Sequence, residues 1–383
     1  MKLYPLQQLT RPDLQSHIYS KALLGNLAAL KSLCAPHTKF CAVIKANAYG
    51  HGITEVVNIL KDADVDFFAV ASFYEALHVV GLIDRQSILI LEPIVPHCPP
   101  DRIFACVNHR LHCVMATLHA HEYVAGLLDG SDNILDIHVN VESGMGRCGI
   151  DPDCAVELIK RIDDCPNTRL AGVYTHFATA DEEDLSYARR QLDTFNAFLA
   201  DTGLPDRTDV IIHSANSAAT IKMPRAHFDM VRCGISLYGY YSRPMTDPPV
   251  TLQPVMKLQA PIVQIKHIGA GCPVSYGCSF TPTRNTTAAI VPLGYADGYW
   301  RCFSNKAVMK LGERLVGVIG RVCMDQLIID VTDVPDVSLG QMVTVIDNSH
   351  DSPCGVYKLA ELADSICYEI LTCIHAHVNR IVH

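Results

Sequence analysis

The feature that most constrains the fold is an eightfold alternation of short apolar runs with helical patterns between Leu14 and Gly234. Runs that are apolar throughout predict strands covered on both faces, and the helical patterns between them predict parallel strands joined by crossover helices. Eight such units in about 220 residues match the size of a (β/α)₈ barrel, although an open doubly wound sheet would show the same periodicity. The predicted strands are Phe40 to Lys45, Phe67 to Ala71, Ser87 to Leu91, His112 to Ala116, Ile134 to Val141, Leu170 to His176, Val210 to His213 and Phe228 to Arg232.

The chain changes character after Tyr241, where the segment SRPMTDPPVTLQP carries four prolines. Proline has no backbone N–H, so neither a helix nor a central strand can run through this linker. We therefore predict a barrel domain over residues 13–243 and a mostly β domain over residues 244–383, with residues 1–12 joining the second domain. The strands predicted there are Pro261 to Ile268, Ala288 to Pro292, Leu315 to Ile319, Leu327 to Val331 and Met342 to Ile346, followed by a helical stretch from Leu359 to Cys373.

Charge and cysteine content exclude several classes of partner. Lys and Arg number 31 against 40 Asp and Glu, a net charge of −9, and no basic run could follow a phosphate backbone, so no nucleic acid is expected. No apolar stretch reaches the roughly 18 residues of a membrane span, and the N-terminus lacks the apolar core of a signal peptide. The 16 cysteines include no C-x-x-C pair, so we expect reduced, mostly buried thiols in a cytoplasmic protein and no metal site.

The strongest local signal is the segment AVIKANAYGHG, in which Lys45 ends a buried strand and a glycine-punctuated loop follows. Burial lowers the pKa of a lysine, and an amine that loses its proton can form a Schiff base with an aldehyde cofactor or act as a base. A lysine that extends to solvent or forms an ion pair is the alternative. Lys45 is thus a candidate catalytic residue.

Other polar residues follow later strands, at the barrel end where chemistry is expected. Arg147, in VESGMGRCG, could bind a carboxylate through both guanidinium nitrogens, and His176 lies in GVYTHFATAD. The segments HSANS and RCGI combine hydroxyl, amide and glycine backbone groups that suit a phosphate. Taken one at a time, a surface arginine, a core histidine and ordinary turns would explain these residues equally well.

Together with VSYG at Tyr276, GYADG at Tyr295, GRVCMD at Met324 and the pair Tyr368-Glu369, these segments resemble the motifs of the alanine racemase family in content and order. The resemblance covers most of the chain. It implies a (β/α)₈ barrel followed by a β domain, pyridoxal 5'-phosphate as cofactor and interconversion of L-alanine and D-alanine. It also implies a homodimer whose active sites combine residues of both subunits.

The resemblance also implies individual roles. Lys45 would carry the cofactor and act as one base, while Tyr276 of the partner subunit would be the second base. Arg232 would face the pyridine nitrogen and discourage its protonation, linked to the tyrosine through His176. The implied cofactor contacts are Lys45, Tyr49, His176, Asn216, Ser217, Arg232, Gly234, Ile235 and Tyr368, and the implied substrate contacts are Arg147, Tyr295 and Met324.

The sequence departs from the family pattern beside Arg147. Asn140 stands where many relatives have a lysine that becomes carbamylated, and we expect a bound anion such as chloride to take its place. Three alternative functions share the scaffold or its lysine: a racemase of broad or serine specificity, a non-catalytic pyridoxal-phosphate-binding protein and a decarboxylase. D-Alanine made by a racemase would feed peptidoglycan synthesis, whereas a catabolic enzyme would degrade it.

Overall fold

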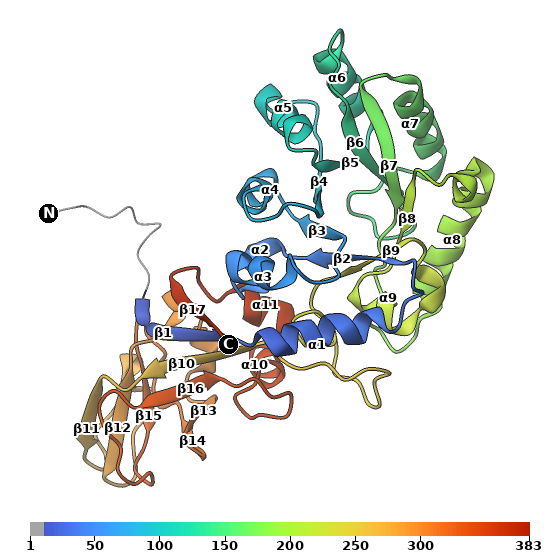
Figure 1. Ribbon diagram of the computed structural model, residues 1–383. Coiled ribbons are helices and arrows are strands. Elements are labelled where there is room, and N and C mark those ends of the chain that lie inside the picture. Colours follow the sequence, from blue (N-terminus) through green and yellow to red (C-terminus); the bar gives the residue numbers. More distant parts are fainter. Residues whose placement is uncertain (1–10) are drawn as a thin grey trace, which may run out of the picture.

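The computed structural model describes residues 11–383, which form a barrel and a mostly β domain beside it (Figure 1). Eight parallel strands close the barrel, so the predicted fold class is confirmed and the open sheet is not. The strands β3 and β6 are buried at every residue because helices cover them outside and side chains fill the barrel inside. The barrel strands are β2 (Lys39–Val43), β3 (Phe67–Val70), β4 (Ser87–Pro93), β5 (His112–Met115), β6 (Leu135–Asn140), β7 (Thr168–Tyr174), β8 (Ile211–His213) and β9 (Met230–Cys233).

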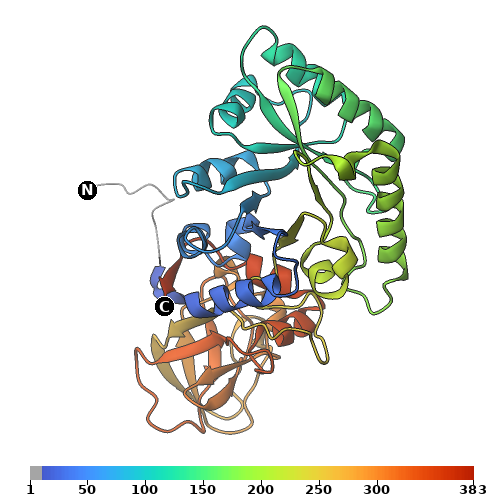
Figure 2. The ribbon, with the colours of Figure 1, turned by 45° about the vertical axis from the view of Figure 1, so that its right-hand side comes forward.

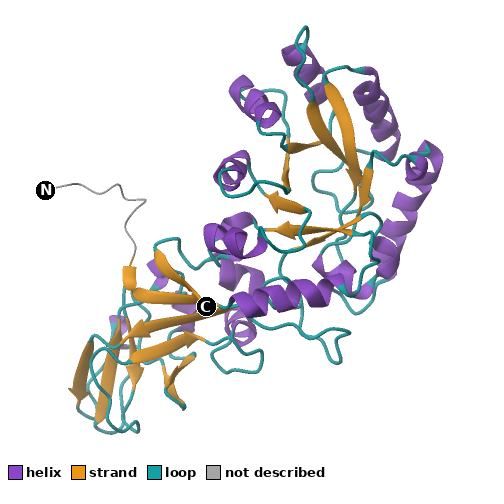
Figure 3. Ribbon diagram, in the orientation of Figure 1, coloured by secondary structure: helices purple, strands orange, loops and turns teal. Residues whose placement is uncertain are grey.

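Helices surround these strands, as the colouring by secondary structure shows (Figure 3). In α7, Ala155, Leu158, Ile159 and Ile162 are buried and share one face, the spacing expected of a helix packed on a sheet. The helices of the barrel are α1 (Ser20–Lys31), α2 (Lys45–Tyr49), α3 (Ile53–Leu60), α4 (Phe73–Val80), α5 (Pro100–Asn108), α6 (Leu118–Leu128), α7 (Pro152–Asp164), α8 (Ser186–Thr202) and α9 (Ser217–Lys222), with short 3₁₀ turns at Leu204–Asp206 and Pro224–Ala226.

Two sheets build the β domain, which stays separate from the barrel strands when the molecule is turned (Figure 2). The larger sheet has the order β14-β13-β16-β10-β1-β17 and the smaller β11-β12-β15. The strands are β1 (Arg11–Ile18), β10 (Met256–Pro261), β11 (Gln264–Ile268), β12 (Thr286–Val291), β13 (Val308–Leu311), β14 (Arg314–Gly317), β15 (Leu327–Asp330), β16 (Met342–Ile346) and β17 (Val378–Val382). The helices are α10 (Val356–Ala363) and α11 (Cys367–Thr372), and the 3₁₀ turns are η4 (Tyr276–Cys278), η5 (Tyr295–Asp297) and η6 (Arg301–Phe303).

The strand β1 comes before the barrel in sequence but belongs to the β domain. It pairs antiparallel with β10 and parallel with β17. The boundary placed at residue 13 therefore falls inside this strand. Residues 1–10, most of the segment expected to join the second domain, lie outside the described residues.

The cysteines are more exposed than the sequence suggested, although each is a free thiol. Ten of the 16 lie wholly or partly at the surface, so the expectation of mostly buried thiols is wrong. Within the part of the chain that the structure describes, no helix combines the length and apolar character needed to cross a bilayer. The buried thiols are Cys41, Cys106, Cys113, Cys233, Cys354 and Cys367.

Candidate active site

The first residues of the site lie on a turn of unusual handedness after β2. Residues 46–49 all have φ between 51° and 54°, which makes one left-handed helical turn that ends at Gly50 (φ 79°). Each non-glycine residue in this region costs about 1–2 kcal/mol relative to a right-handed turn, so surrounding contacts must hold it. Gly50 is required where it stands, because a Cβ there would lie 2.0 Å from the carbonyl oxygen of Leu371 in α11.

Glu75, in the first turn of α4, holds the start of this turn. Its carboxylate accepts the backbone N–H of Ala46 (2.8 Å), of Ala71 (2.7 Å) and of Ser72 (3.2 Å). Ser72 and Glu75 also form a capping box at the start of α4. Glu75 was not among the residues predicted from the sequence, although the spacing Ser-x-x-Glu after a strand was a signal that could have indicated it.

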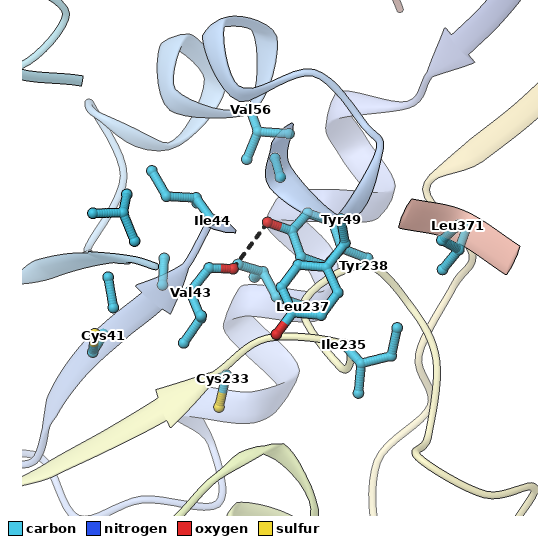
Figure 4. Packing of buried hydrophobic residues seen from close by; sticks show 14 of the residues in the cluster. Cys41, Val43, Ile44, Tyr49, Val56, Cys233, Ile235, Leu237, Tyr238 and Leu371 are labelled. Atoms are coloured by element: carbon cyan, nitrogen blue, oxygen red, sulfur yellow. Dashed lines mark hydrogen bonds between the residues drawn. The ribbon is translucent and has the colours of Figure 1, made fainter. Parts of the chain in front are cut away.

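Tyr49 fixes the other end of the turn against the barrel floor. It packs on Tyr238, whose hydroxyl donates to the carbonyl of Val43 (3.0 Å) in β2 (Figure 4). The Tyr49 hydroxyl approaches Gly234 so closely that a Cβ on Gly234 would lie 2.3 Å from it. Burial raises the pKa of Tyr49, so the phenol stays protonated and remains a hydrogen-bond donor.

A cavity of about 740 Å³ opens above this turn at the carboxyl ends of the barrel strands. It collects ten of the residues singled out from the sequence, which come from six separate segments of the chain. Asn140, the departure from the family pattern, also lines it. The ten are Lys45, Tyr49, Arg147, His176, Asn216, Ser217, Arg232, Gly234, Ile235 and Tyr368.

Lys45 lies at the foot of the cavity with a lowered pKa. Burial is the largest cause, and the positive charge of Arg147 adds to it, while Glu75 opposes both. Each of these effects acts on the charged ammonium form. Lys45 is therefore closer to losing its proton than an exposed lysine would be.

A buried arginine lies deeper in the cavity. The guanidinium of Arg232 donates to Nδ1 of His213 (2.7 Å) and contacts Nδ1 of His176 (3.3 Å), as the sequence predicted for His176. It also lies over the ring of Tyr174, with 4.9 Å between the guanidinium carbon and the ring centroid. Burial, Arg232, Arg147 and Lys45 lower the pKa of His176 to about 3, so this ring is neutral at physiological pH.

One side of the cavity is lined with hydroxyl groups and backbone amides. The hydroxyl oxygen of Ser217 accepts the N–H of Gly234 (2.9 Å), and the hydroxyls of Tyr368 and Ser242 are 2.8 Å apart. The side chain of Asn216 accepts the N–H of Ala219 (3.0 Å) and so begins α9. These groups suit an anion with several oxygen atoms.

The loop that carries Arg147 is organised by a carboxylate. Glu142 accepts the backbone N–H groups of Gly144 (2.6 Å), Met145 (2.5 Å) and Gly146 (2.9 Å). Burial raises the pKa of Glu142, but these hydrogen bonds outweigh it, and the pKa lies below its usual value. The loop therefore has a fixed shape, and it presents Arg147 at the mouth of the cavity.

Three residues of the predicted site do not line the cavity. Tyr276, Tyr295 and Met324 lie in the β domain, with 71%, 42% and 54% of their surface exposed. Two of the loops that carry these residues are joined by backbone hydrogen bonds. The N–H of Tyr295 donates to the carbonyl of Cys323 (3.1 Å), and the N–H of Ala296 donates to that of Met324 (3.0 Å). We refer to Tyr276, Tyr295 and Met324 as the exposed triad.

The buried His51 should make the free energy of unfolding depend on pH. Burial lowers the pKa of His51 from 6.5 to about 4. As the pH falls below 6.5, the unfolded chain therefore binds a proton at this residue that the folded chain does not bind. The free energy of unfolding should therefore decrease as the pH falls. In His51→Asn, an amide can still donate to the carbonyls that His51 contacts, and the slope should decrease by up to about 1.4 kcal/mol per pH unit.

Urea unfolding at a series of pH values between about 7.5 and 4.5 would measure this slope. The exposed His37 provides the matched control, because His37→Asn makes the same substitution away from the buried turn. Equal slopes for His51→Asn and the unchanged protein would contradict the prediction.

Comparison with known proteins agrees with this geometry. Residues 18–242 match the family described as alanine racemase, N-terminal domain, and residues 255–382 match alanine racemase, C-terminal domain. The alanine racemase of Desulfosudis oleivorans is 33% identical over 370 residues, which cover 94% of each chain. The alanine racemase structure of Clostridium difficile 630 superposes with a TM-score of 0.89 at 31% identity, covering 97% of this chain and 96% of that one. The chain therefore belongs to the alanine racemase family.

Proposed function

We propose that the protein interconverts L-alanine and D-alanine with pyridoxal phosphate as its cofactor. The observation that carries the proposal is a lysine with a lowered pKa at the foot of a cavity whose other polar groups are a buried arginine, a second arginine at the mouth and a set of hydroxyls. This set offers one amine for a covalent bond and separate sites for a carboxylate and a phosphate. Homologues bearing the name alanine racemase support the same substrate.

The residues present fit pyridoxal phosphate. Gly234 leaves room where a Cβ would meet the Tyr49 hydroxyl, so backbone and phenol can face the phosphate together with Ser217 and Tyr368. Asn216 and Ile235 would complete this end of the site. When bound, the cofactor supplies an aldehyde for condensation with an amine and a ring that stabilises negative charge on the α-carbon.

Each remaining residue has a defined task in this proposal. Nζ of Lys45 takes or returns the α-proton on one face of the substrate, which its lowered pKa favours. The guanidinium of Arg147 binds the substrate carboxylate, and Asn140 with a chloride ion supports Arg147 where relatives use a carbamate. Arg232 presents N–H donors to the pyridine nitrogen and cannot protonate it, because a guanidinium stays charged. Anomalous scattering from a bromide soak would test the anion; no peak beside Arg147 would contradict it.

The second base is Tyr276 of the partner subunit. Racemisation removes a proton from one face and returns it to the other, which one base on each face achieves most simply. Tyr276 is exposed and belongs to a triad outside the cavity of its own chain, as expected of residues that complete a partner's site. We therefore propose a homodimer in which Tyr276, Tyr295 and Met324 close the substrate pocket of the other subunit.

Mixing two inactive variants tests this arrangement. Lys45→Ala and Tyr276→Phe each disable both sites of their own homodimer, but a mixed dimer contains one site with both bases. The purified mixed dimer should therefore have about half of the full activity. The variants are co-expressed with different tags, and the mixed dimer is purified and assayed. If the mixed dimer is as inactive as its parents, the two bases belong to one chain.

The activity itself is tested by chiral chromatography of alanine incubated with the purified protein and pyridoxal phosphate. We expect both enantiomers to approach equal amounts from either side. Serine in the same assay separates an alanine enzyme from one of broader specificity. Ethylamine as product would indicate a decarboxylase, and bound cofactor without turnover would indicate a carrier protein. Either of these two results would overturn the proposal.

We place this activity in the cytoplasm. A cytoplasmic racemase takes L-alanine from protein metabolism and supplies D-alanine to the ligases that build peptidoglycan, or it runs in the opposite direction during D-alanine breakdown. Growth of a deletion strain with and without added D-alanine distinguishes the two roles. A requirement for D-alanine supports the biosynthetic one.

A further inference from the structure

A row of three histidines crosses the interior of the barrel and ends at Arg232. Nδ1 of His213 contacts Arg232 (2.7 Å), Nε2 of His213 contacts Nδ1 of His138 (2.9 Å), and Nε2 of His138 contacts Nδ1 of His112 (3.0 Å). We refer to His112, His138 and His213 as the histidine row. Its members come from β5, β6 and β8, so the row passes β7 without using a residue of that strand.

Gly172 makes this crossing possible. It pairs with His138 in the register of β6 and β7, and a Cβ on Gly172 would lie 2.3 Å from Nδ1 of His138. Two aromatic rings hold the row from its sides. Tyr174 stacks on His213 with 4.9 Å between ring centroids, and Phe67 meets His112 edge-on at 5.1 Å.

Arg232 fixes the direction of every hydrogen bond in the row. A guanidinium only donates, so Nδ1 of His213 must accept, and a neutral ring with an accepting Nδ1 carries its proton on Nε2. The same step applied twice places the proton of His138 and of His112 on Nε2 as well. Burial holds the pKa of His138 and of His213 well below the usual value, which keeps both rings neutral.

The row cannot deliver a proton to the cavity, because it ends at a group that neither accepts nor releases one near neutral pH. At its other end, His112 faces the ion pair between Asp136 and Arg169, whose Oδ1 and Nε are 2.5 Å apart. Burial and Arg169 lower the pKa of His112, and Asp136 opposes them. The row can therefore fix the orientation of its rings and of Arg232, but it cannot carry a proton.

We propose that His138 and His112 are positioning residues that hold Arg232, through His213, in the orientation the proposed reaction requires. His112 fixes the tautomer of His138, and His138 fixes that of His213. A reversed tautomer would point an N–H at Arg232 and push the guanidinium toward its contacts with the carbonyls of Thr175 and Ser214. The inference rests on the proposed role of Arg232 facing the cofactor ring.

Two substitutions of His112 separate orientation from packing. Asn at this position keeps an oxygen near Nδ1 to accept from His138, whereas Leu fills space but leaves the His138 N–H without an acceptor. We expect kcat for alanine to fall about three- to tenfold in His112→Leu, with KM unchanged, and to stay within about twofold in His112→Asn. Asn is the smaller residue, so thermal stability should decrease at least as much in the Asn variant. Parallel losses of kcat and stability in both variants would overturn the proposal.

A neutron crystal structure of the cofactor-loaded enzyme provides the readout that does not depend on activity. We expect deuterium on Nε2 of all three rings and none on Nδ1. Deuterium on Nδ1 of any member would overturn the proposed polarity even if the enzyme racemises alanine. If the rings show the expected tautomers but no amino acid is racemised, the proposed function fails and the polarity of the row stands.

Discussion

Lys45→Ala is expected to lower alanine interconversion by at least about 10³-fold, because one substitution removes both the proposed covalent anchor of the cofactor and one of the two proposed bases. The structure gives Lys45 a lowered pKa at the foot of the cavity, directly before the left-handed turn. The loss should appear in chiral chromatography from either enantiomer. The absorbance of a lysine-bound aldehyde should disappear with it.

Lys39 is the matched control. It is exposed and begins β2, the strand that Lys45 follows, so Lys39→Ala removes a lysine from the opposite end of the same strand. This variant should keep full activity and the bound-aldehyde absorbance. If Lys45→Ala retained more than about a tenth of the activity, another amine would have to carry the cofactor.

Tyr276→Phe removes one hydroxyl and should lower interconversion by about 10²- to 10⁴-fold. The expected defect differs between the two enantiomers of alanine. By analogy with the family, Lys45 serves the D-enantiomer, so D-alanine should still exchange its α-hydrogen with D₂O while L-alanine should not. Proton NMR of each enantiomer in D₂O measures both rates. Cofactor binding should be unchanged, because the residues proposed to hold the cofactor all line the cavity of the other subunit and Tyr276 is not among them.

The control for this variant is Tyr74→Phe. Tyr74 is 65% exposed on α4, and its hydroxyl contacts Arg102, so its loss should affect neither exchange nor interconversion. Exchange of both enantiomers at normal rates in Tyr276→Phe would show that a different group protonates the second face.

The barrel is predicted well from the sequence because each of its strands has a local signal, a short apolar run. All eight expected runs coincide with observed strands to within a few residues, since strands covered on both faces have near-continuous apolar sequences. The β domain is less predictable. β1 alternates buried and half-exposed residues and contains Gln15, Ser16 and His17, and its strand character depends on partners more than 200 residues away. The predicted last helix is split into α10 and α11 at Asp364, which has φ 51°.

In the candidate site, too, some features could be predicted from the sequence and others could not. Residue types and motif order indicated Lys45, Arg147 and Arg232, and the cavity brings these together. The left-handed turn after Lys45 could not be predicted, because Ala46, Ala48 and Tyr49 have no intrinsic preference for positive φ and are held by tertiary contacts such as that of Glu75. Nor could the histidine row, since it depends on which side chains meet inside a closed barrel.

The parallel pairing of β1 with β17 bears on how the enzyme matures on the ribosome. Translation produces every strand of the barrel by Cys233, but the sheet that begins with β1 is completed only when β17 emerges. The same late strand carries Arg380, whose guanidinium donates to the carbonyl of Gly50 (2.8 Å) at the end of the lysine turn. A nascent chain therefore exposes an unpaired strand edge through most of its synthesis, and the proposed cofactor site is finished among the last parts of the molecule.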